Sequence, residues 1–245
     1  MRVLAAQTAA EVSMTLRRGE TLLLTVGIPV LFLAFFSTVH VVTTPTAKGV
    51  NFFVPGILSL AVMSTAMVSL GIATGFERGY GVLKRLGSTP LGRPRLLGAK
   101  IATIVVVETL QAAILVSVGL ILGWRPGGHG SAATVAGAAA AVLLASVAFS
   151  GIGLLLAGVL RAEVNLAAAN GLYLVLLLSG GMVVPVTRLP GGLASVAELL
   201  PADALSAALH ATLGSGSAVP MLSWVVLAAW ALVAPLAAAL TFHWE

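Results

Sequence analysis

The chain has no cysteine among its 245 residues, and only 9% of those residues are charged. Without cysteine, disulfides, zinc–thiolate sites and thiol catalysis are all excluded. A soluble domain is about a quarter charged, whereas here 59% of the residues are hydrophobic. Water would not keep such a chain dispersed, so lipid is the expected solvent for most of it.

Short sequence motifs for nucleotide binding, nucleophilic catalysis and zinc binding are also absent. The sequence contains no G-x-x-x-x-G-K-[ST] phosphate loop, no G-x-S-x-G elbow and no H-E-x-x-H pair. Each of these would have placed a nucleotide, a nucleophile or a zinc ion. We therefore expect no ATP site, no cofactor and no metal on this chain, and no enzymatic activity of its own.

What the sequence does have is a series of long apolar runs separated by short polar segments. The first run has 22 residues, which as a helix would rise about 33 Å and cross a membrane. It is too long for a signal-peptide core, so we expect it to be retained. The sequence predicts an all-α integral membrane protein forming one transmembrane domain, 1–245, with six transmembrane helices: 21–42, 50–76, 97–122, 131–160, 166–184 and 218–240.

Three polar segments carry further structure. Residues 1–20 are predicted to form an amphipathic interfacial helix, with a plain cytosolic lead-in as the alternative. Residues 160–165 read as a short charged loop. Residues 185–217 are mixed in polarity and are broken by Pro190 and Pro201.

The cations indicate an orientation. With the N-terminus in the cytoplasm, ten of the thirteen Lys and Arg fall on inner segments and three on outer ones. Such a bias is the rule for cytoplasmic loops, so both termini are expected to be cytoplasmic. The inner ten are Arg2, Arg17, Arg18, Arg78, Lys84, Arg85, Arg93, Arg95, Lys100 and Arg161, and the outer three are Lys48, Arg125 and Arg188.

Six of these cations gather in the loop 76–96 and just beyond it. Glu77 to Leu86 can form a short helix that ends at Gly87, with Glu77 near its start. Thr89 then suits an N-cap and Pro90 the first helical position. Topology and anionic lipid account for the charge. A capped, half-apolar helix is better accounted for by docking into a groove on a cytosolic partner.

The stretch "NFFVPGILSLAVMSTAMVSLGIATGFERGYGVLKRLGSTPLGRPRLLGAK" (51–100) resembles the signature of the type-2 ABC exporter permeases. It is closest to the daunorubicin-resistance-type drug-export permeases of actinobacteria. The matching elements are F-x-x-P-G at Phe52, Pro55 and Gly56, E-R-x-x-G at Glu77, Arg78 and Gly81, K-R-L at Lys84, Arg85 and Leu86, and T-P-L with a following arginine at Thr89, Pro90, Leu91 and Arg93. The set is specific, whereas each element alone is weak.

The resemblance implies a function. The loop 76–96 would be the cytoplasmic coupling helix, seated in a cleft of a separate ATPase subunit. That subunit would be present in two copies and would bind ATP and Mg²⁺, and a second permease, a copy or a paralogue, would complete the complex. Segment 185–217 would be a re-entrant helical hairpin on the outer face of a bacterial plasma membrane. The cargo would be hydrophobic drugs or lipids, moved outward, as in antibiotic efflux.

A few polar residues fall inside the predicted spans. Glu108 lies near mid-membrane, where an ionised carboxylate is costly, and Gln111 follows at i+3, within hydrogen-bonding reach. Glu108 fits either a substrate-cation or proton site, or an interhelical hydrogen bond. Asn165 and Asn170 could line a cavity or bond across helices. Glycine pairs four apart, such as Gly71 and Gly75, are assigned to close helix packing.

Two other functions remain open from the residues. An ion-coupled secondary transporter or channel without an ATPase would need ionisable groups inside the membrane, and the spans offer chiefly Glu108. A membrane scaffold that transports nothing is the third reading.

Overall fold

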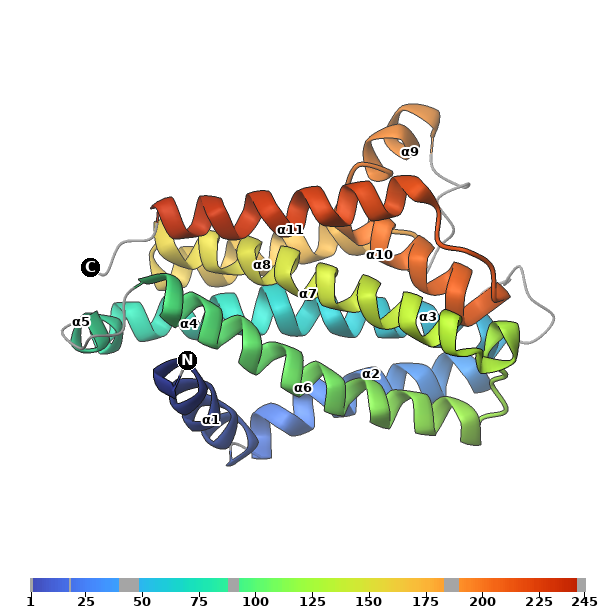
Figure 1. Cartoon of the computed structure of the whole chain (residues 1–245), viewed down its shortest axis with the longest axis horizontal. Coiled ribbons are helices and arrows are strands. Elements are labelled where there is room, and N and C mark those ends of the chain that lie inside the picture. The colour runs from blue at the N-terminus through green and yellow to red at the C-terminus, as the bar shows by residue number, and fades with distance from the viewer. Residues whose placement is uncertain (1, 18, 40–48, 88–92, 183–189, 242–245) are drawn as a thin grey trace.

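The computed structural model describes residues 2–17, 19–39, 49–87, 93–182 and 190–241. The regular structure in these ranges is entirely helical, and the long helices run side by side along the longest axis of the molecule (Figure 1). Five helices are long and apolar enough to cross a membrane, or six if one bent pair counts as a span. The predicted all-α membrane class is therefore confirmed.

The first half of the chain supplies α1, which lies outside the main bundle, the shorter apolar helix α2, and two helices long enough to span a membrane. The second predicted span is a continuous helix of 31 residues, Gly49–Gly79, that contains a π-helical turn in its middle. The elements are α1 (Arg2–Arg17), α2 (Gly19–Thr38), α3 (Gly49–Met63), η1 (Ser64–Ser69), α4 (Leu70–Gly79), α5 (Val82–Gly87) and α6 (Arg93–Ile121).

The second half supplies three more spans and a bent helix pair. Ser131 caps the fourth span because its hydroxyl oxygen accepts from the Thr134 amide at 3.3 Å. The elements are η2 (Gly127–Gly130), α7 (Ala132–Val159), α8 (Ala162–Ser179), α9 (Gly191–Ala197), α10 (Pro201–Leu209), η4 (His210–Ser215) and α11 (Met221–Thr241).

One predicted boundary is wrong, and another lies partly outside the described residues. α2 covers most of the predicted span 21–42, whose end falls in the range 40–48 outside the described residues, and the apolar part described is Thr25–Thr38. The predicted loop 160–165 is too long, because α8 already begins at Ala162. Glu163 then lies in the first turn of α8, where the positive end of the helix dipole favours an acidic side chain.

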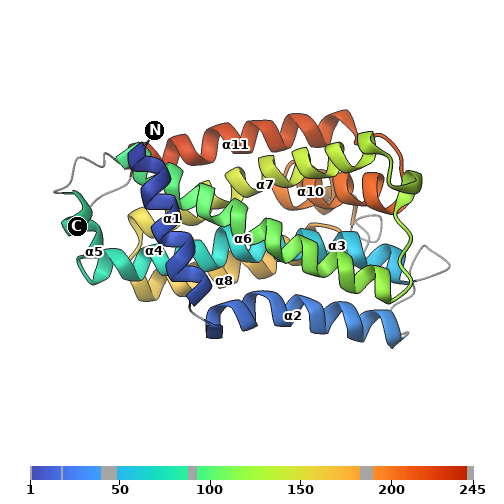
Figure 2. The same cartoon turned by 60° about the horizontal axis from the view of Figure 1, so that its bottom comes forward.

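The two ends of the bundle carry different elements. In Figure 1, α1, α5 and the last turns of α11 lie at one end, and α9 and the loop that carries η2 lie at the other. Figure 2 shows α1 crossing α6 obliquely. On α1, Gln7 and Glu11 are half-buried, whereas Ala9 and Met14 are exposed. The polar face of this helix therefore turns towards the protein.

The bent pair before α11 packs into the bundle. The axis of α9 makes an angle of 84° with that of α10 and η4, and α9 projects outward (Figure 1). By contrast α10 contacts α3, α7, α8 and α11, and its Leu205 and Leu209 are fully buried. The hairpin thus has one exposed arm and one arm that belongs to the core.

Candidate functional site

The cationic loop begins with a turn instead of a helix. α4 continues through Glu77 and Arg78 to Gly79, and Gly81 then adopts φ +71°, a backbone conformation open to glycine. The predicted single helix from Glu77 to Leu86 is therefore wrong. Glu77 belongs to the last turn of the preceding span, and a separate short helix, α5, starts at Val82 and ends at Gly87 as expected.

Part of the predicted motif lies outside the described residues. Thr89 and Pro90 fall in the range 88–92, so their capping role stays a prediction. Arg85 and Leu86 lie on α5 and Arg93 begins α6, but their side chains are outside the described part of the chain.

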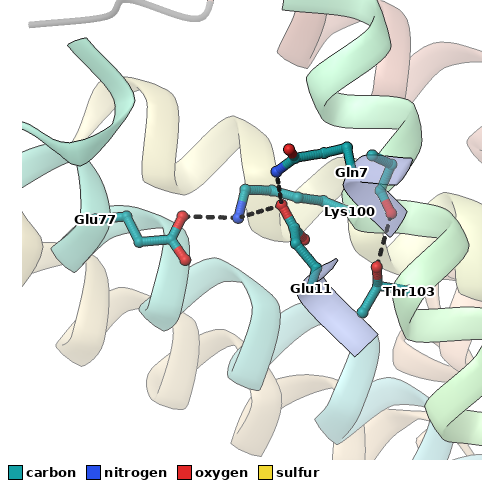
Figure 3. Close-up of polar contacts among 6 residues, drawn as sticks. Gln7, Glu11, Glu77, Lys100 and Thr103 are labelled. Atoms are coloured by element: carbon teal, nitrogen blue, oxygen red, sulfur yellow. Dashed lines mark hydrogen bonds and ion pairs between the residues drawn. The ribbon is translucent and has the colours of Figure 1, made fainter. Parts of the chain in front are cut away.

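Lys100 on α6 holds three helices together at this end (Figure 3). Its Nζ lies 2.7 Å from Glu77 Oε2 on α4 and 3.7 Å from Glu11 Oε1 on α1. Gln7 Nε2 donates to the same Glu11 oxygen at 3.0 Å. The Lys100 side chain is only 4% exposed, so its charge is balanced by protein carboxylates with little help from water.

Arg78 ties the same turn to a fourth helix. Its guanidinium donates to the carbonyl of Gly158 and, at 2.6 Å, to that of Leu160, at the end of α7. These carbonyls have lost their helical partners, and a cation is favourable at this pole of the helix. Glu77 and Arg78, expected to contact an ATPase, are thus both engaged within the chain. We name this set of contacts, made by Glu11, Glu77, Arg78 and Lys100, the joint.

Beyond the joint, α5 presents a mixed surface. Tyr80 is 75% exposed and Val82 is 42% exposed, and Lys84 is exposed as well. Leu83 is fully buried and fixes the helix to the molecule. The exposed surface of the turn at Tyr80 and of α5 therefore combines an aromatic ring, an aliphatic side chain and a cation.

The second polar site lies inside the membrane region. Glu108 on α6 is 2% exposed, and its Oε2 is hydrogen-bonded by the Ser146 hydroxyl on α7. Its Oε1 has no hydrogen-bond partner among the described residues. Both residues line a cavity of about 450 Å³ between α6 and α7, whose other walls are mainly apolar and include Leu58, Ala112, Val116, Leu120, Trp124, Val135, Ala139, Leu143 and Leu209.

The Gln111 side chain makes its hydrogen bonds to residues other than Glu108. Its amide nitrogen donates to the Thr25 carbonyl on α2 at 2.6 Å, and its oxygen accepts from the Thr65 hydroxyl in η1 at 3.2 Å. The expectation of a shared bond with Glu108 is wrong, because both polar ends of the amide are engaged on other helices. Gln111 instead joins α6 to the first and second spans.

The two asparagines have different environments. Asn165 is fully buried and donates to the Gly71 carbonyl on α4 at 2.8 Å, with Gly75 packed against its amide. Asn170 is exposed and donates to Leu166 of its own helix. Of the two proposed roles, Asn165 takes the bond across helices, and neither residue lines the cavity described above.

The sequence matches the family described as ABC-2 type transporter over residues 3–213. The chain belongs to this family. The match runs from α1 into η4 and so includes both the joint and the cavity. A protein of Bacillus subtilis (strain 168), YvfS, which is named as a transport permease, is 25% identical over 210 residues, covering 82% of this chain and 81% of its own length.

Three functional candidates in this ABC-2 family member escape sequence reasoning. Lys100 counts only as one cation of six in the sequence, although two of the eight acids of the chain prove to surround it. Ser146 lies 38 residues from Glu108 and carries no local signal. Tyr80, between two glycines, could have been noticed as an aromatic residue in a polar turn.

Proposed function

We propose that this chain is the membrane-spanning permease subunit of an ATP-driven exporter in a bacterial plasma membrane. It works with a second permease, a copy or a paralogue, and with two copies of a separate ATPase subunit that bind ATP and Mg²⁺. The chain itself is a transport subunit, not an enzyme. Membership of the ABC-2 type transporter family supports this assignment.

The observation that carries the proposal is the joint at the end of α4. Glu77 is paired with Lys100 of α6, which also reaches Glu11 of α1, and Arg78 is bonded to the end of α7. A displacement of α5 therefore acts on several helices at once instead of bending a free loop. A nucleotide bound elsewhere can then bias two arrangements of the spans.

The exposed surface of the turn at Tyr80 and of α5 supports docking to a partner. Tyr80 and Val82 are exposed where the chain has left the apolar bundle. An aromatic anchor beside cations is the kind of surface that fills a groove on another protein. α5 is then the coupling helix, and Lys84 and Arg85 contribute charge to the contact.

The arrangement of the two ends supports the orientation. α1 and α5 lie at one end and α9 at the other (Figure 1). With the cation-rich end in the cytoplasm, both termini are cytoplasmic and the α9–α10 pair is the re-entrant hairpin of the outer face. The apolar cavity between α6 and α7 favours hydrophobic drugs or lipids as cargo.

The test replaces residues 80–87 by a flexible Gly-Ser segment in the full chain, co-expressed with its partner ATPase subunit. We expect loss of co-purification, or loss of ATP-dependent export from vesicles with the complex still assembled. Tyr80→Ala with Val82→Asp should act in the same direction, and Arg125→Gln at the opposite end is the control. Full export with the replaced segment would reject the coupling role.

A second candidate function is an ion-coupled transporter or channel without an ATPase. The unpartnered oxygen of Glu108 favours it, because a buried acid can carry a proton or a cation across. The discriminating measurement is transport in vesicles with a proton gradient but no ATP, and then with ATP and a protonophore. Transport only in the first condition would replace the exporter by this alternative.

A further inference from the structure

The cavity between α6 and α7 is a slot with a defined direction. On α6 its wall is one helical face, at Val105, Glu108, Ala112, Val116 and Leu120, which recur every three or four residues. Glu108 and Leu120 are about 18 Å apart along that face at 1.5 Å per residue. The slot is therefore elongated, with the carboxyl group near one end.

Small side chains keep the slot open. Ala112 on α6 lines the cavity, as do Ala138 and Ala139 on α7, and larger side chains at these positions would reduce its volume. Leu209 of α10 and Leu213 of η4 form part of the floor. The walls are thus aliphatic along the length of the slot, which suits an apolar chain or ring system.

Polar atoms at both ends lack partners. Glu108 Oε1 and Trp124 Nε1 are buried and have no hydrogen-bond partner among the described residues, and both residues line the cavity. A buried acceptor left unpaired is costly, and more so for a charged group. The slot therefore lacks a donor at the Glu108 end.

The Ser146 hydroxyl does not supply the missing hydrogen-bond donor for Glu108 Oε1. Its oxygen is within hydrogen-bonding distance of both Glu108 Oε2 and the Val142 carbonyl, yet a hydroxyl has one hydrogen. If that hydrogen goes to Val142, a protonated Glu108 donates to Ser146 before an amine binds. An amine nitrogen that enters then takes the proton, since an N–H bond forms as the O–H bond breaks, and the resulting ammonium faces the carboxylate.

We propose that this slot binds an elongated hydrophobic monoamine, with its nitrogen at Glu108 and its apolar body extending along α6 towards Trp124. The identification of this ligand as cargo rests on the proposed exporter function. A neutral acyl chain would fill the same walls but would leave Glu108 Oε1 without a donor. The carboxyl group therefore selects an amine over an uncharged chain of equal length.

Binding is measured on the full-length protein in lipid nanodiscs. The probes are a straight-chain ω-bromoalkylamine of about the length of the slot and the bromoalkanol of equal length. Bromine at the chain end quenches the fluorescence of Trp124. The same titration on Trp124→Phe measures the contribution of the other tryptophans, which is then subtracted. We expect the amine to bind more tightly than the alcohol.

Variants test the role of the carboxyl group. Glu108→Gln keeps the shape and should weaken amine binding by about tenfold or more, while alcohol binding stays unchanged. The matched control is Glu163→Gln, an exposed acid at the start of α8, which should bind both probes as the wild type does. Equal amine affinity in Glu108→Gln, or equal affinity of the wild type for amine and alcohol, would overturn the proposal.

A second pair of variants tests the location. Ala112→Leu fills the slot and should abolish binding of both probes, whereas Ala113→Leu, on the exposed side of the same helix, should have no effect. Unchanged binding in Ala112→Leu would place the probes elsewhere and overturn the proposal, and thermal unfolding of each variant confirms that it is folded.

Transport separates this inference from the exporter function. If the complex with its ATPase exports the amine and Glu108→Gln exports it equally well, the slot is not the cargo site and the exporter function stands. If the complex exports nothing with ATP while binding follows the expected pattern, the slot stands as an amine site and the exporter function fails.

Discussion

Lys100 Nζ donates to Glu77 Oε2 across 2.7 Å, which joins the start of α6 to the last turn of α4. Glu11 of α1 lies on the same ammonium group. The N-terminal helix and the end of the second span thus share one charge. A movement of α4 therefore acts on α1 and α6 through this side chain as well as through the packing of the helices.

Removal of the Lys100 charge should destabilise the protein. Lys100→Met removes the ammonium group that both Glu77 and Glu11 contact. We expect a loss of about 2 kcal/mol, below the cost for a fully buried pair because the Glu77 side chain is 37% exposed. Unfolding in mixed detergent–SDS micelles measures it, with Arg125→Gln as the control. Unchanged stability would mean that the contacts of Lys100 with Glu77 and Glu11 do not contribute to the free energy of unfolding.

Lysine should replace only part of the stabilisation that the Arg78 guanidinium provides. Arg78→Gln loses both bonds to the end of α7 and should cost about 1–3 kcal/mol, whereas Arg78→Lys keeps the charge and should cost less. The same unfolding assay compares them with Arg161→Gln, whose side chain makes no capping bond at the start of α8. An equal cost for Arg78→Gln and Arg78→Lys would show that the two-bond geometry does not matter.

Gln111 should stabilise the packing of the first span. Gln111→Met keeps the volume but removes the bonds to Thr25 and Thr65, at an expected cost of about 1 kcal/mol. Ser117→Ala, which removes a hydroxyl bonded only within α6, is the control. Accessibility of cysteines introduced on α2 should rise in the Gln111 variant. If it does not, α2 is held by its apolar contacts alone.

A close backbone contact between α7 and η1 should tolerate no added methyl group. A Cβ at Gly153 on α7 would lie 2.4 Å from the Met67 carbonyl in η1. Gly153→Ala should therefore destabilise the protein by about 1–3 kcal/mol or prevent its accumulation in the membrane.

Gly171→Ala is the matched control for that change. Nothing lies within 4 Å of a Cβ at Gly171 in α8, so alanine should stabilise the helix by about 0.5–1 kcal/mol. Expression level and thermal unfolding of the two variants are compared directly. A similar effect of both changes would show that the contact between Gly153 and Met67 is looser than the distance indicates.

Most of the span architecture is predictable because it depends on length and polarity alone. Five of the predicted runs coincide with long apolar helices, with their ends displaced by a few residues. The loop 160–165 was mispredicted because Arg161 and Glu163 look like loop residues, although an acid in the first turn is what a helix start favours.

The site was less predictable because its contacts join distant segments. Glu108 was recognised from its cost in a membrane, but Ser146 is brought to it only by the packing of α7 on α6. The i+3 spacing suggests Gln111 as a partner for Glu108. In the fold, the Gln111 amide instead hydrogen-bonds to Thr25 and Thr65 on other helices. The prediction of one helix from Glu77 to Leu86 misses the turn at Gly79–Gly81, where glycine permits a sharp change of direction.

The burial of α10 restricts the routes by which a molecule can leave. A helix whose Leu205 and Leu209 are fully buried leaves no room for a water-filled duct at its position. Because Leu209 also lines the slot, a molecule lodged there must either move sideways into the bilayer or wait until α10 shifts.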